Sequence, residues 1–353
     1  MFENPLVAID IGSHSIKVVE ISGTTEKQVV RTGLRTLPPG AIVNGIIKDR
    51  AVVRKNLVAL LKELGVRKFF RRASLAVSGS AVIIKRSKIT PNDEVDLAEQ
   101  VFSEAEQQFQ TDMNELYFDY QLWPDPMGND QYALMIGTRR ETINERVEIV
   151  RNSGLLIGVV DCDLFALTNV VEKNYGEIAG ITAVLNIGSG TSHVVFIANN
   201  QYLYSREIGM GGESYTKALA DALKITIGEA EQQKIQVSLP EGVIAPELAK
   251  HISEMHELLI SEFQMAVEFF FQSGEAPLEH DRVKGLFLCG GGAQVLGLTQ
   301  AFETKLEIPV HLLDPFENIP FGKKLIGSEN LINNRASFGV AVGLGMRRFG
   351  ERD

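Results

Sequence analysis

The sequence predicts an α/β fold of two related lobes, and three observations support this prediction. The chain has 353 residues, about twice the length of a typical single domain. A strand, turn and strand motif occurs twice, and another apolar strand runs into three consecutive glycines. Hydrophobic residues make up 44% of the chain and charged residues 23%, which is typical of a protein with a full core and not of a disordered chain.

The repeated motif relates the two halves of the chain. Residues 10–21 align without gaps with residues 186–197, and six of the twelve positions are identical. Each copy follows an apolar run and contains a polar turn, which is the pattern of a strand, a tight turn and a second strand. We therefore expect the second half to begin near Gly180.

After its hairpin, the first half has the pattern of a helix followed by strands. Helical periodicity extends over 49–64, with Asp49 as the expected N-cap and Gly65 at the C-terminal end. Residues 74–84 alternate between apolar and polar side chains as strands do.

An insert and a long helical region interrupt this repeated pattern. Residues 87–152 change to helix, strand, strand and helix, at 94–109, 116–122, 132–136 and 141–151. The first half then resumes with a strand at 155–160 and a helix at 163–174. In the second half, residues 211–274 are almost wholly helical by pattern, and their apolar stripe predicts core packing.

Charge and cysteine content exclude several classes of protein. The chain has 35 Lys and Arg against 45 Asp and Glu, and the net charge of −10 disfavours a nucleic-acid groove. The two cysteines, Cys162 and Cys289, are too few for a disulfide framework or a zinc site. The N-terminus lacks the pattern of a secretory signal, and no run approaches the roughly 18 apolar residues of a membrane span, so we expect a cytoplasmic protein.

The two hairpin turns contain residue types that bind phosphate. Glycine lets the backbone approach a ligand closely, and successive N–H groups in such a turn bind anions. Asp10 ends a strand and is placed to hold hydrated Mg²⁺, and Lys17 on the return strand is placed to neutralise a phosphate. Two facing turns of this kind predict a polyphosphate site.

Another glycine-rich turn follows the apolar strand at 286–289. Gly290, Gly291 and Gly292 precede the start of a helix, so the backbone can lie against a ligand there. Such turns are common, and only their combination with the duplicated hairpins is specific.

Together these features resemble the actin-like ATPases, the superfamily of actin, the heat-shock chaperones, sugar kinases, FtsA and MreB. The resemblance extends over essentially the whole chain and implies an α/β, actin-like ATPase fold with duplicated RNase H-like lobes. It places ATP and Mg²⁺ in the cleft between the lobes. The connecting helices would be 163–171 and 337–347, where Gly339, Gly343 and Gly345 would allow close helix packing.

The resemblance also implies which residues contact the ligands. Catalytic roles fall on Asp10, Asp163 and His193, and metal binding falls on Asp10 and Asn186. The residues implied to bind nucleotide lie in the two hairpin turns, in the helical region and in the glycine-rich turn. They are Gly12, Ser13, His14, Ser15, Lys17, Gly188, Ser189, Gly190, Thr191, Gly212, Glu213, Glu231, Lys234, Gly290, Gly291, Gly292 and Gln294.

The position of the insert resembles FtsA and the PilM family of type IV pilus assembly proteins, which carry a small α/β subdomain, 1C, at this point. Residues 76–85 and 336–347 are most similar to the PilM family. FtsA proteins end in a linker and an amphipathic membrane-targeting helix, which the residues after Arg347 do not resemble. We therefore expect PilM-like recruitment to the inner membrane through a protein partner, with only indirect membrane contact.

By this resemblance the chain has four subdomains. They are 1A, at 1–86 with 153–180 and 331–353; 1C, at 87–152; 2A, at 181–210 with 283–330; and 2B, at 211–282.

Four positions leave alternatives open. Asn186 stands where the superfamily usually has a second Asp, so we expect weaker metal binding or hydrolysis and retained nucleotide binding. Asp163 could orient the attacking water or cap its helix. His193 lies where actin has a histidine near the hydrolytic water, and His14 could donate to a phosphate, although a structural role is the commoner one for such histidines.

The PilM resemblance implies an ATP-binding scaffold of the type IV pilus inner-membrane platform. The implied partner is the cytoplasmic N-terminal peptide of PilN, and through PilN the PilO/PilN complex, with the peptide between the first subdomain and the insert 87–152. Nucleotide would be a structural or switching ligand with slow or absent hydrolysis. The alternatives are a filament-forming division protein like FtsA and an active ATPase or sugar-kinase-like phosphotransferase.

Overall fold

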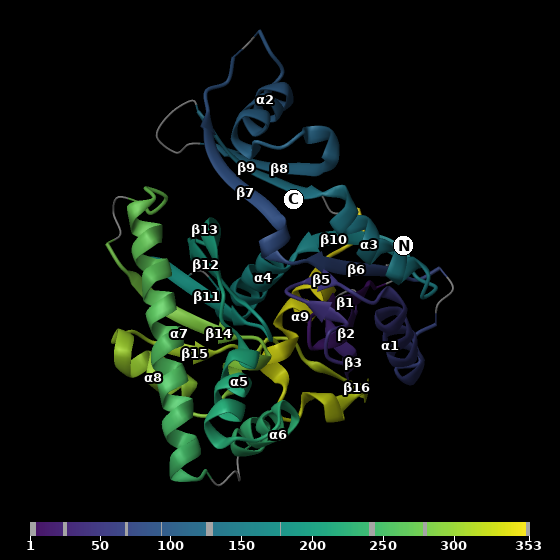
Figure 1. Ribbon diagram of the computed structural model, residues 1–353. Coiled ribbons are helices and arrows are strands. Elements are labelled where there is room, and N and C mark those ends of the chain that lie inside the picture. Colours follow the sequence, from purple (N-terminus) through teal and green to yellow (C-terminus); the bar gives the residue numbers. More distant parts are fainter. Residues whose placement is uncertain are drawn as a thin grey trace.

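In the computed structural model, the chain forms two α/β lobes and a smaller α/β subdomain (Figure 1). The structure describes residues 5–23, 27–67, 70–92, 94–124, 130–176, 178–239, 244–277 and 281–350. In Figure 1 the first lobe lies on the right, the second lobe on the left and the smaller subdomain at the top.

A six-stranded sheet forms the first lobe, in the order β10-β6-β1-β2-β3-β16. Its strands are β1 (Val7–Ile11), β2 (Ser15–Ser22), β3 (Gln28–Thr36), β6 (Arg72–Val77), β10 (Leu156–Cys162) and β16 (Phe321–Ile326). The three consecutive strands β1, β2 and β3 pair antiparallel, whereas β6 runs parallel to β1 and β10 runs parallel to β6. Val7, Ala8 and Ile9 of β1 are fully buried, as expected for a central strand covered on both faces.

A five-stranded sheet forms the second lobe, in the order β13-β12-β11-β14-β15. Its strands are β11 (Ile181–Ile187), β12 (Ser192–Ala198), β13 (Gln201–Ile208), β14 (Val283–Cys289) and β15 (Val310–Leu312). This order matches β3-β2-β1-β6-β10 strand for strand, and each pair of neighbours has the same relative direction in both lobes. The duplication seen in the sequence is therefore present in the topology.

The helices pack on the faces of these sheets. The α-helices of the described residues are α1 (Arg50–Glu63), α2 (Leu97–Phe109), α3 (Arg140–Arg151), α4 (Asp163–Tyr175), α5 (Gly212–Leu223), α6 (Ile227–Val237), α7 (Pro246–Gln272), α8 (Leu298–Leu306) and α9 (Gly339–Met346). Short 3-10 helices are η1 (Gly79–Ala81), η2 (Met113–Glu115), η3 (Gly291–Gln294), η4 (Ser328–Leu331) and η5 (Arg335–Phe338). The predicted N-cap at Asp49 is present, because its carboxylate accepts the N–H of Val52 at 2.9 Å.

Helices α4 and α9 cross between the lobes at very close range. A Cβ placed on Gly343 would lie 2.0 Å from the carbonyl oxygen of Ala166, and one on Gly339 would lie 2.6 Å from Leu167 Cδ2. Gly343 is therefore needed for the crossing, because a Cβ there meets backbone atoms, whereas a Cβ on Gly339 meets only a leucine side chain that can move. Gly345 differs, since it faces Ile21 of β2. The core around this crossing contains apolar side chains of both sheets, so the two lobes share one interior.

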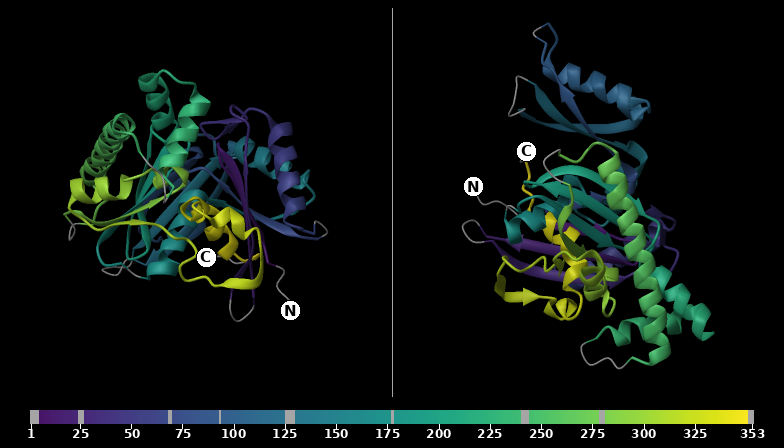
Figure 2. Two further views of the ribbon diagram at one scale, coloured as in Figure 1. Left: turned by 90° about the horizontal axis from the view of Figure 1, so that it is seen from below. Right: turned by 90° about the vertical axis from the view of Figure 1, so that its left-hand side faces the viewer.

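The smaller subdomain has a core of its own and consists of α2 packed on a three-stranded sheet. The sheet order is β7 (Val82–Ile89), β9 (Gln131–Arg139) and β8 (Leu116–Pro124). Figure 2 shows this subdomain projecting beyond both lobes. Its limits, 82–139, differ from the predicted 87–152, because Val147 and Val150 of α3 pack into the core of the first lobe.

One further boundary differs from the predicted subdomains. Strand β16 lies within the range assigned to 2A but pairs with β3 of the first lobe. Helices α5, α6 and α7, assigned to 2B, share one core with the second sheet, where Phe270 stacks on Phe196 with ring centroids 4.4 Å apart. This packing agrees with the core role that the apolar stripe of residues 211–274 predicts.

Within the ranges that the structure describes, no helix combines the length and the apolarity that a membrane span requires. Cys162 and Cys289 are both buried free thiols.

Candidate functional site

A cavity of about 550 Å³ opens between the two lobes. Its walls include the first hairpin turn, the second hairpin turn, the start of α4, helices α5 and α6, and the glycine-rich turn at η3. Every residue that the sequence assigned to catalysis, metal binding or nucleotide binding lines this cavity. The structure thus brings the assigned residues together, and their individual roles stay predictions.

The two hairpin turns have the same backbone register. Asp10 lies opposite Lys17 in the first hairpin, and Asn186 lies opposite His193 in the second. In each turn the glycine two residues after this acidic or amide position donates its N–H to the carbonyl three residues later, at 3.1 Å in both cases. The gapless sequence alignment therefore corresponds to a true structural equivalence.

The side chains at these equivalent positions interact differently. Lys17 Nζ lies 3.0 Å from Asp10 Oδ2, and both side chains are largely buried. In the second lobe, His193 Nε2 instead lies 3.1 Å from Oε2 of Glu207, on the neighbouring strand β13. The first turn thus brings an ion pair to the cavity, whereas Asn186 brings a neutral amide.

Asp163 is the first residue of α4, and Cys162 occupies the N-cap position. The Asp163 carboxylate accepts the N–H of Gly79 at 2.7 Å, which ties α4 to η1. Burial raises the pKa of Asp163, although the attraction of His193 and the hydrogen bond from Gly79 act in the opposite direction. The arrangement gives a carboxyl group that accepts a proton more readily than an exposed aspartate.

Helix α5 docks directly on the second hairpin turn. The N–H groups of Gly212 and Glu213 donate to the carbonyls of Gly188 and Ser189, at 2.9 and 2.8 Å. The Ser189 hydroxyl in turn donates to the Glu213 carboxylate at 2.7 Å. The N-terminus of α5 and the second turn therefore form one unit.

A buried polar cluster connects α5 with α6 at the edge of the cavity. Lys234 Nζ lies 2.7 Å from Glu231 Oε2 and donates to Gly212 O and Thr216 Oγ1, each at 2.9 Å. The Thr216 hydroxyl also bonds the Glu231 carboxylate. Although burial acts to raise it, Lys234, Thr216 and His14 hold the pKa of Glu231 below its ordinary value. His14 belongs to the first lobe, so this interaction acts across the cleft.

The glycine-rich turn packs on the second hairpin in a way that only glycine permits. Gly290 has a φ of +87°, and a Cβ there would lie 2.4 Å from Ile187 O and 2.5 Å from Asn186 Oδ1. A Cβ on Gly292 would lie 2.4 Å from Ile187 Cγ2, whereas one on Gly291 would have nothing within 4 Å. Two of the glycines therefore fit the turn to the hairpin, and the third leaves open space.

Sequence reasoning missed several polar residues of the cavity wall, among them Arg146, Asn44 and Asn334. The signal for Arg146 was present, since it lies among the apolar positions of α3 beside Val147, where a charge is unexpected. The two asparagines belong to loops that carry no motif, and no feature of the sequence distinguishes them.

The donor set allows a magnesium ion only with help from the nucleotide. Within the part of the chain that the structure describes, no three His, Cys, Asp or Glu side chains cluster as metal ligands. Asp10 supplies one carboxylate and Asn186 one amide oxygen at the cavity wall. Mg²⁺ usually binds proteins through one or two carboxylates together with substrate phosphates and water, so this pair fits a nucleotide-bound ion and no independent metal centre.

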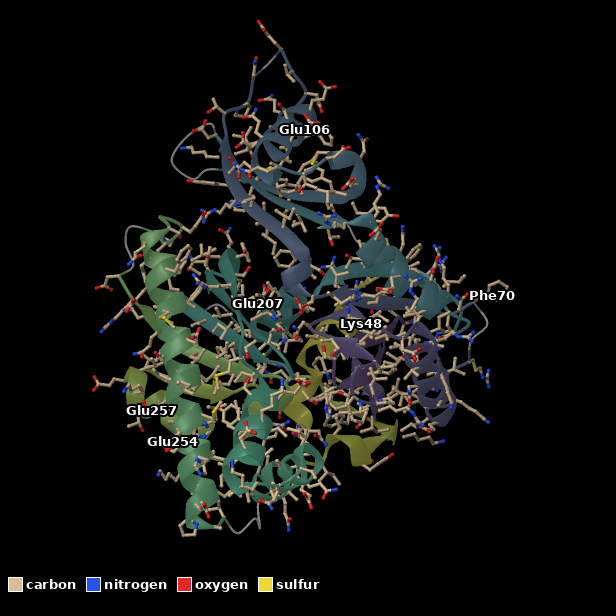
Figure 3. All side chains as sticks on the ribbon, in the orientation of Figure 1. Lys48, Phe70, Glu106, Glu207, Glu254 and Glu257 are labelled. Atoms are coloured by element: carbon tan, nitrogen blue, oxygen red, sulfur yellow. The ribbon has the colours of Figure 1, made fainter. Side chains whose placement is uncertain are left out.

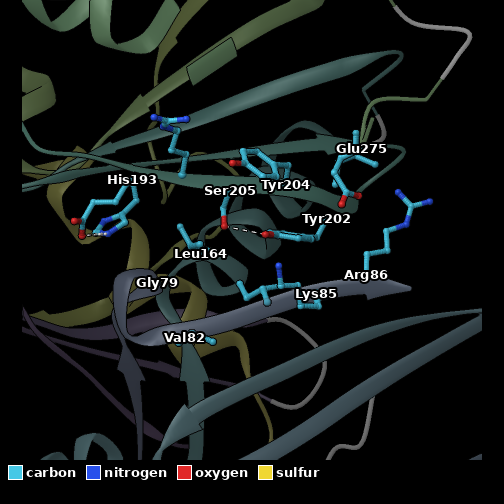
Figure 4. Close-up of a pocket in the computed structure, with 14 residues that line it drawn as sticks. Gly79, Val82, Lys85, Arg86, Leu164, His193, Tyr202, Tyr204, Ser205 and Glu275 are labelled. Atoms are coloured by element: carbon cyan, nitrogen blue, oxygen red, sulfur yellow. Dashed lines mark hydrogen bonds and ion pairs between the residues drawn. The ribbon is translucent and has the colours of Figure 1, made fainter. Parts of the chain in front are cut away.

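A second hollow, of about 200 Å³, lies between β7 and β13. Figure 4 shows Val82, Lys85 and Arg86 on one side, Tyr202 and Tyr204 on the other, and Leu164 and Gly79 between them. Glu207 also lines this hollow and lies near the centre of the molecule in Figure 3. His193 lines both the hollow and the large cavity, so the two share a wall.

Comparisons with known proteins are consistent with this architecture. The cell division protein FtsA of Enterococcus hirae is 22% identical over 88% of this chain and 78% of its own length. A structure of a PilM-PilN type IV pilus biogenesis complex matches with a TM-score of 0.81 and 24% identity, over 97% of this chain and 98% of the other. MreB5 of Spiroplasma citri bound to AMPPNP matches with a TM-score of 0.50 and 12% identity, over 96% and 94%.

The fold is therefore that of the actin-like ATPases. The sequence profile of the family described as type IV pilus assembly protein PilM matches residues 8–349, nearly the whole chain. The chain belongs to the PilM family of type IV pilus assembly proteins.

Proposed function

We propose that this protein is an ATP-binding cytoplasmic scaffold of the type IV pilus inner-membrane platform, which binds the cytoplasmic N-terminal peptide of PilN. The observation that carries the proposal is the convergence of both hairpin turns and the glycine-rich turn on one cavity, which shares a wall with a second hollow beside the insert. The known PilM-PilN complex supports PilN as the partner.

The chain's own residues suit the binding of a nucleotide triphosphate. The backbone of the two glycine-containing turns cradles phosphates, and Lys17 supplies positive charge next to Asp10. Open space at Gly291 leaves room for the adenosine. Mg²⁺, held by Asp10 and the amide oxygen of Asn186, would neutralise phosphate charge.

Slow or absent hydrolysis follows from the second hairpin. Asn186 adds no negative charge to the metal site, and His193 is held by Glu207 at 3.1 Å. Asp163 can orient a water molecule, but of the two equivalent hairpin positions only Asp10 supplies a carboxylate to the metal. Nucleotide therefore acts as a structural or switching ligand.

The hollow between β7 and β13 suits a short peptide with apolar side chains. Its apolar wall includes Val82, Ile84 and Leu164, and its rim has both signs of charge, Lys85 and Arg86 against Glu275. The second lobe forms one wall of this hollow. We call the hollow the partner groove, and it includes residues outside the predicted space between the first subdomain and the insert. His193 and the hydrogen bond from Gly79 to Asp163 lie between the partner groove and the large cavity. A change in the closure of the lobes therefore alters the shape of both.

Titration calorimetry with the N-terminal cytoplasmic peptide of PilN from the same organism tests the partner and the groove together. Ile84→Glu places a charge in the apolar wall and should weaken binding at least about 10-fold. Val95→Glu makes the same chemical change on the exposed surface of the insert and should leave binding unchanged. Equal affinities for the two variants would place the peptide elsewhere, and no binding by the unmodified chain would contradict the partner.

A further inference from the structure

Arg146 is a buried cation at the wall of the large cavity. It lies on α3 with only 4% of its surface exposed, next to Val147 on the side of the helix that faces the first-lobe core. Its side chain lines the cavity together with Asp10 and Asp163. An arginine on an apolar stripe is costly to bury, so its presence needs a physical reason.

The contacts of Arg146 do not neutralise its charge. Nη2 donates to the carbonyl of Gly45 at 2.6 Å and Nη1 to the carbonyl of Thr142 at 3.3 Å. Burial lowers the pKa of Arg146, and among the residues that the structure describes no carboxylate lies within ion-pair distance of it. Glu145, Asp163 and Asp10 favour its charged form from further away. A guanidinium has five N–H donors and stays charged, so this one retains capacity for an anion.

The position of Arg146 points to one part of a nucleotide. It lines the same cavity as Asp10 and Asp163, the residues proposed to hold the metal and orient water, and the glycine-rich turn forms another part of the wall. We propose that Arg146 binds the terminal phosphate of ATP and thereby distinguishes ATP from ADP. This inference rests on the proposed function, since it requires that the cavity bind nucleotide.

Arg146 also connects that phosphate position to the insert. Gly45 lies at the tip of the hairpin of β4 (Ile42–Val43) and β5 (Ile46–Ile47), and its N–H donates to Ser13 Oγ of the first turn at 3.4 Å. The neighbouring Asn44 approaches the second turn, because a Cβ on Gly190 would lie 2.9 Å from Asn44 Oδ1. Helix α3 directly follows β9, the central strand of the insert sheet. Arg146 therefore links phosphate contacts in the cleft to the subdomain beside the partner groove.

The test compares ATP and ADP binding, measured by titration calorimetry with Mg²⁺, for the full chain and for Arg146→Gln. ATP affinity should fall about 10- to 100-fold, the range expected for the loss of a charge-assisted hydrogen bond, and ADP affinity by less than about 3-fold. Arg146→Lys keeps the charge without the planar fork and should lie in between. Arg151→Gln removes an exposed arginine from the same helix and serves as the matched control.

Thermal unfolding without nucleotide separates this role from a structural one. The Gln amide ends two bonds short of Nη2 and gives up the bond to the Gly45 carbonyl, but it also relieves the burial of a charge. These two changes oppose each other, so Arg146→Gln should lower Tm by no more than about 2 °C. Equal losses of ATP and ADP affinity, or a much larger fall in Tm, would show that Arg146 only anchors the hairpin. If the unmodified chain binds ATP and Arg146→Gln binds it equally well, this inference alone fails. If the unmodified chain binds no ATP, the proposed function fails with it.

Discussion

The two hairpin turns have the same backbone and different chemistry. Asp10 and Asn186 occupy the same register position, as do Lys17 and His193, and both turns close with the same N–H to carbonyl bond. In the first lobe the paired residues form an ion pair at 3.0 Å that faces the cavity. In the second lobe the histidine bonds Glu207 of β13 instead.

The two turns of this chain therefore share their backbone geometry, while the charges of their side chains differ. The first lobe supplies the charged side chains at the phosphate position, whereas the second supplies a neutral amide, a docked helix and the glycine-rich turn. We therefore expect charge substitutions to matter most in the first lobe and backbone substitutions most in the second.

The largest expected effect is on ATP affinity when Lys17 is replaced. Lys17→Gln removes a cation from the phosphate site and leaves Asp10 unpaired, so the Kd for ATP should rise about 10- to 100-fold. His193→Gln at the equivalent position should change it less than about 3-fold. Titration calorimetry measures both, and equal losses would contradict the assignment of charge to the first lobe.

The next largest effect tests the backbone of the turns. A Cβ on Gly188 would lie 2.7 Å from the carbonyl oxygen of Thr191, whereas one on Gly12 would lie 3.3 Å from that of Ser15. Gly188→Ala must distort its turn and should weaken ATP binding about 10-fold. Gly12→Ala should weaken ATP binding by a smaller factor. A larger loss for Gly12→Ala would reverse the expected division between the lobes.

A smaller change should follow from restoring the second carboxylate. Asn186→Asp adds a negative charge beside the bound metal, so ATP affinity with Mg²⁺ should rise about 3-fold and affinity in EDTA should fall by a similar factor. Steady-state hydrolysis should also exceed that of the unmodified chain. Affinities that move in the same direction with and without Mg²⁺ would exclude a metal beside this residue.

The smallest effect concerns Asp163 and pH. Burial raises the pKa of Asp163 in the folded state, so its ionised carboxylate lowers the stability of the fold at any pH above that pKa. This loss of stability disappears as the pH falls through the folded-state pKa and then through the unfolded-state pKa of about 4. Asp163→Asn still accepts the Gly79 N–H and should raise Tm by about 1 to 3 °C at pH 8. The gain should shrink as the pH approaches 4, and a gain that grows toward low pH would contradict the burial of a charge.

Local sequence patterns were sufficient to predict the elements that position the site. The aligned segments 10–21 and 186–197 predicted equivalent hairpins, and helix α1 with its Asp49 cap and helix α4 agree with the structure. The close approach at Gly343, which the family resemblance implied, is also present. These features depend on residues near each other in sequence or on a glycine that no other residue can replace.

Features that depend on distant packing were not predicted. Strand β16 pairs with β3 of the first lobe, and α3 packs into the first-lobe core. Both placements depend on contacts between residues that are far apart in the sequence. Arg146 reaches the cavity only through the position of α3, and the pairing of His193 with Glu207 depends on the register of β13. Neither follows from local spacing.

The most direct test of the proposed function measures the PilN peptide and ATP on the same preparation. Calorimetric titration of the N-terminal cytoplasmic peptide into protein with and without saturating ATP and Mg²⁺ should give affinities that differ at least about 5-fold. By linkage, the peptide must change ATP affinity by the same factor. Peptide binding that is absent, or equal with and without ATP, would contradict a scaffold whose nucleotide controls its partner.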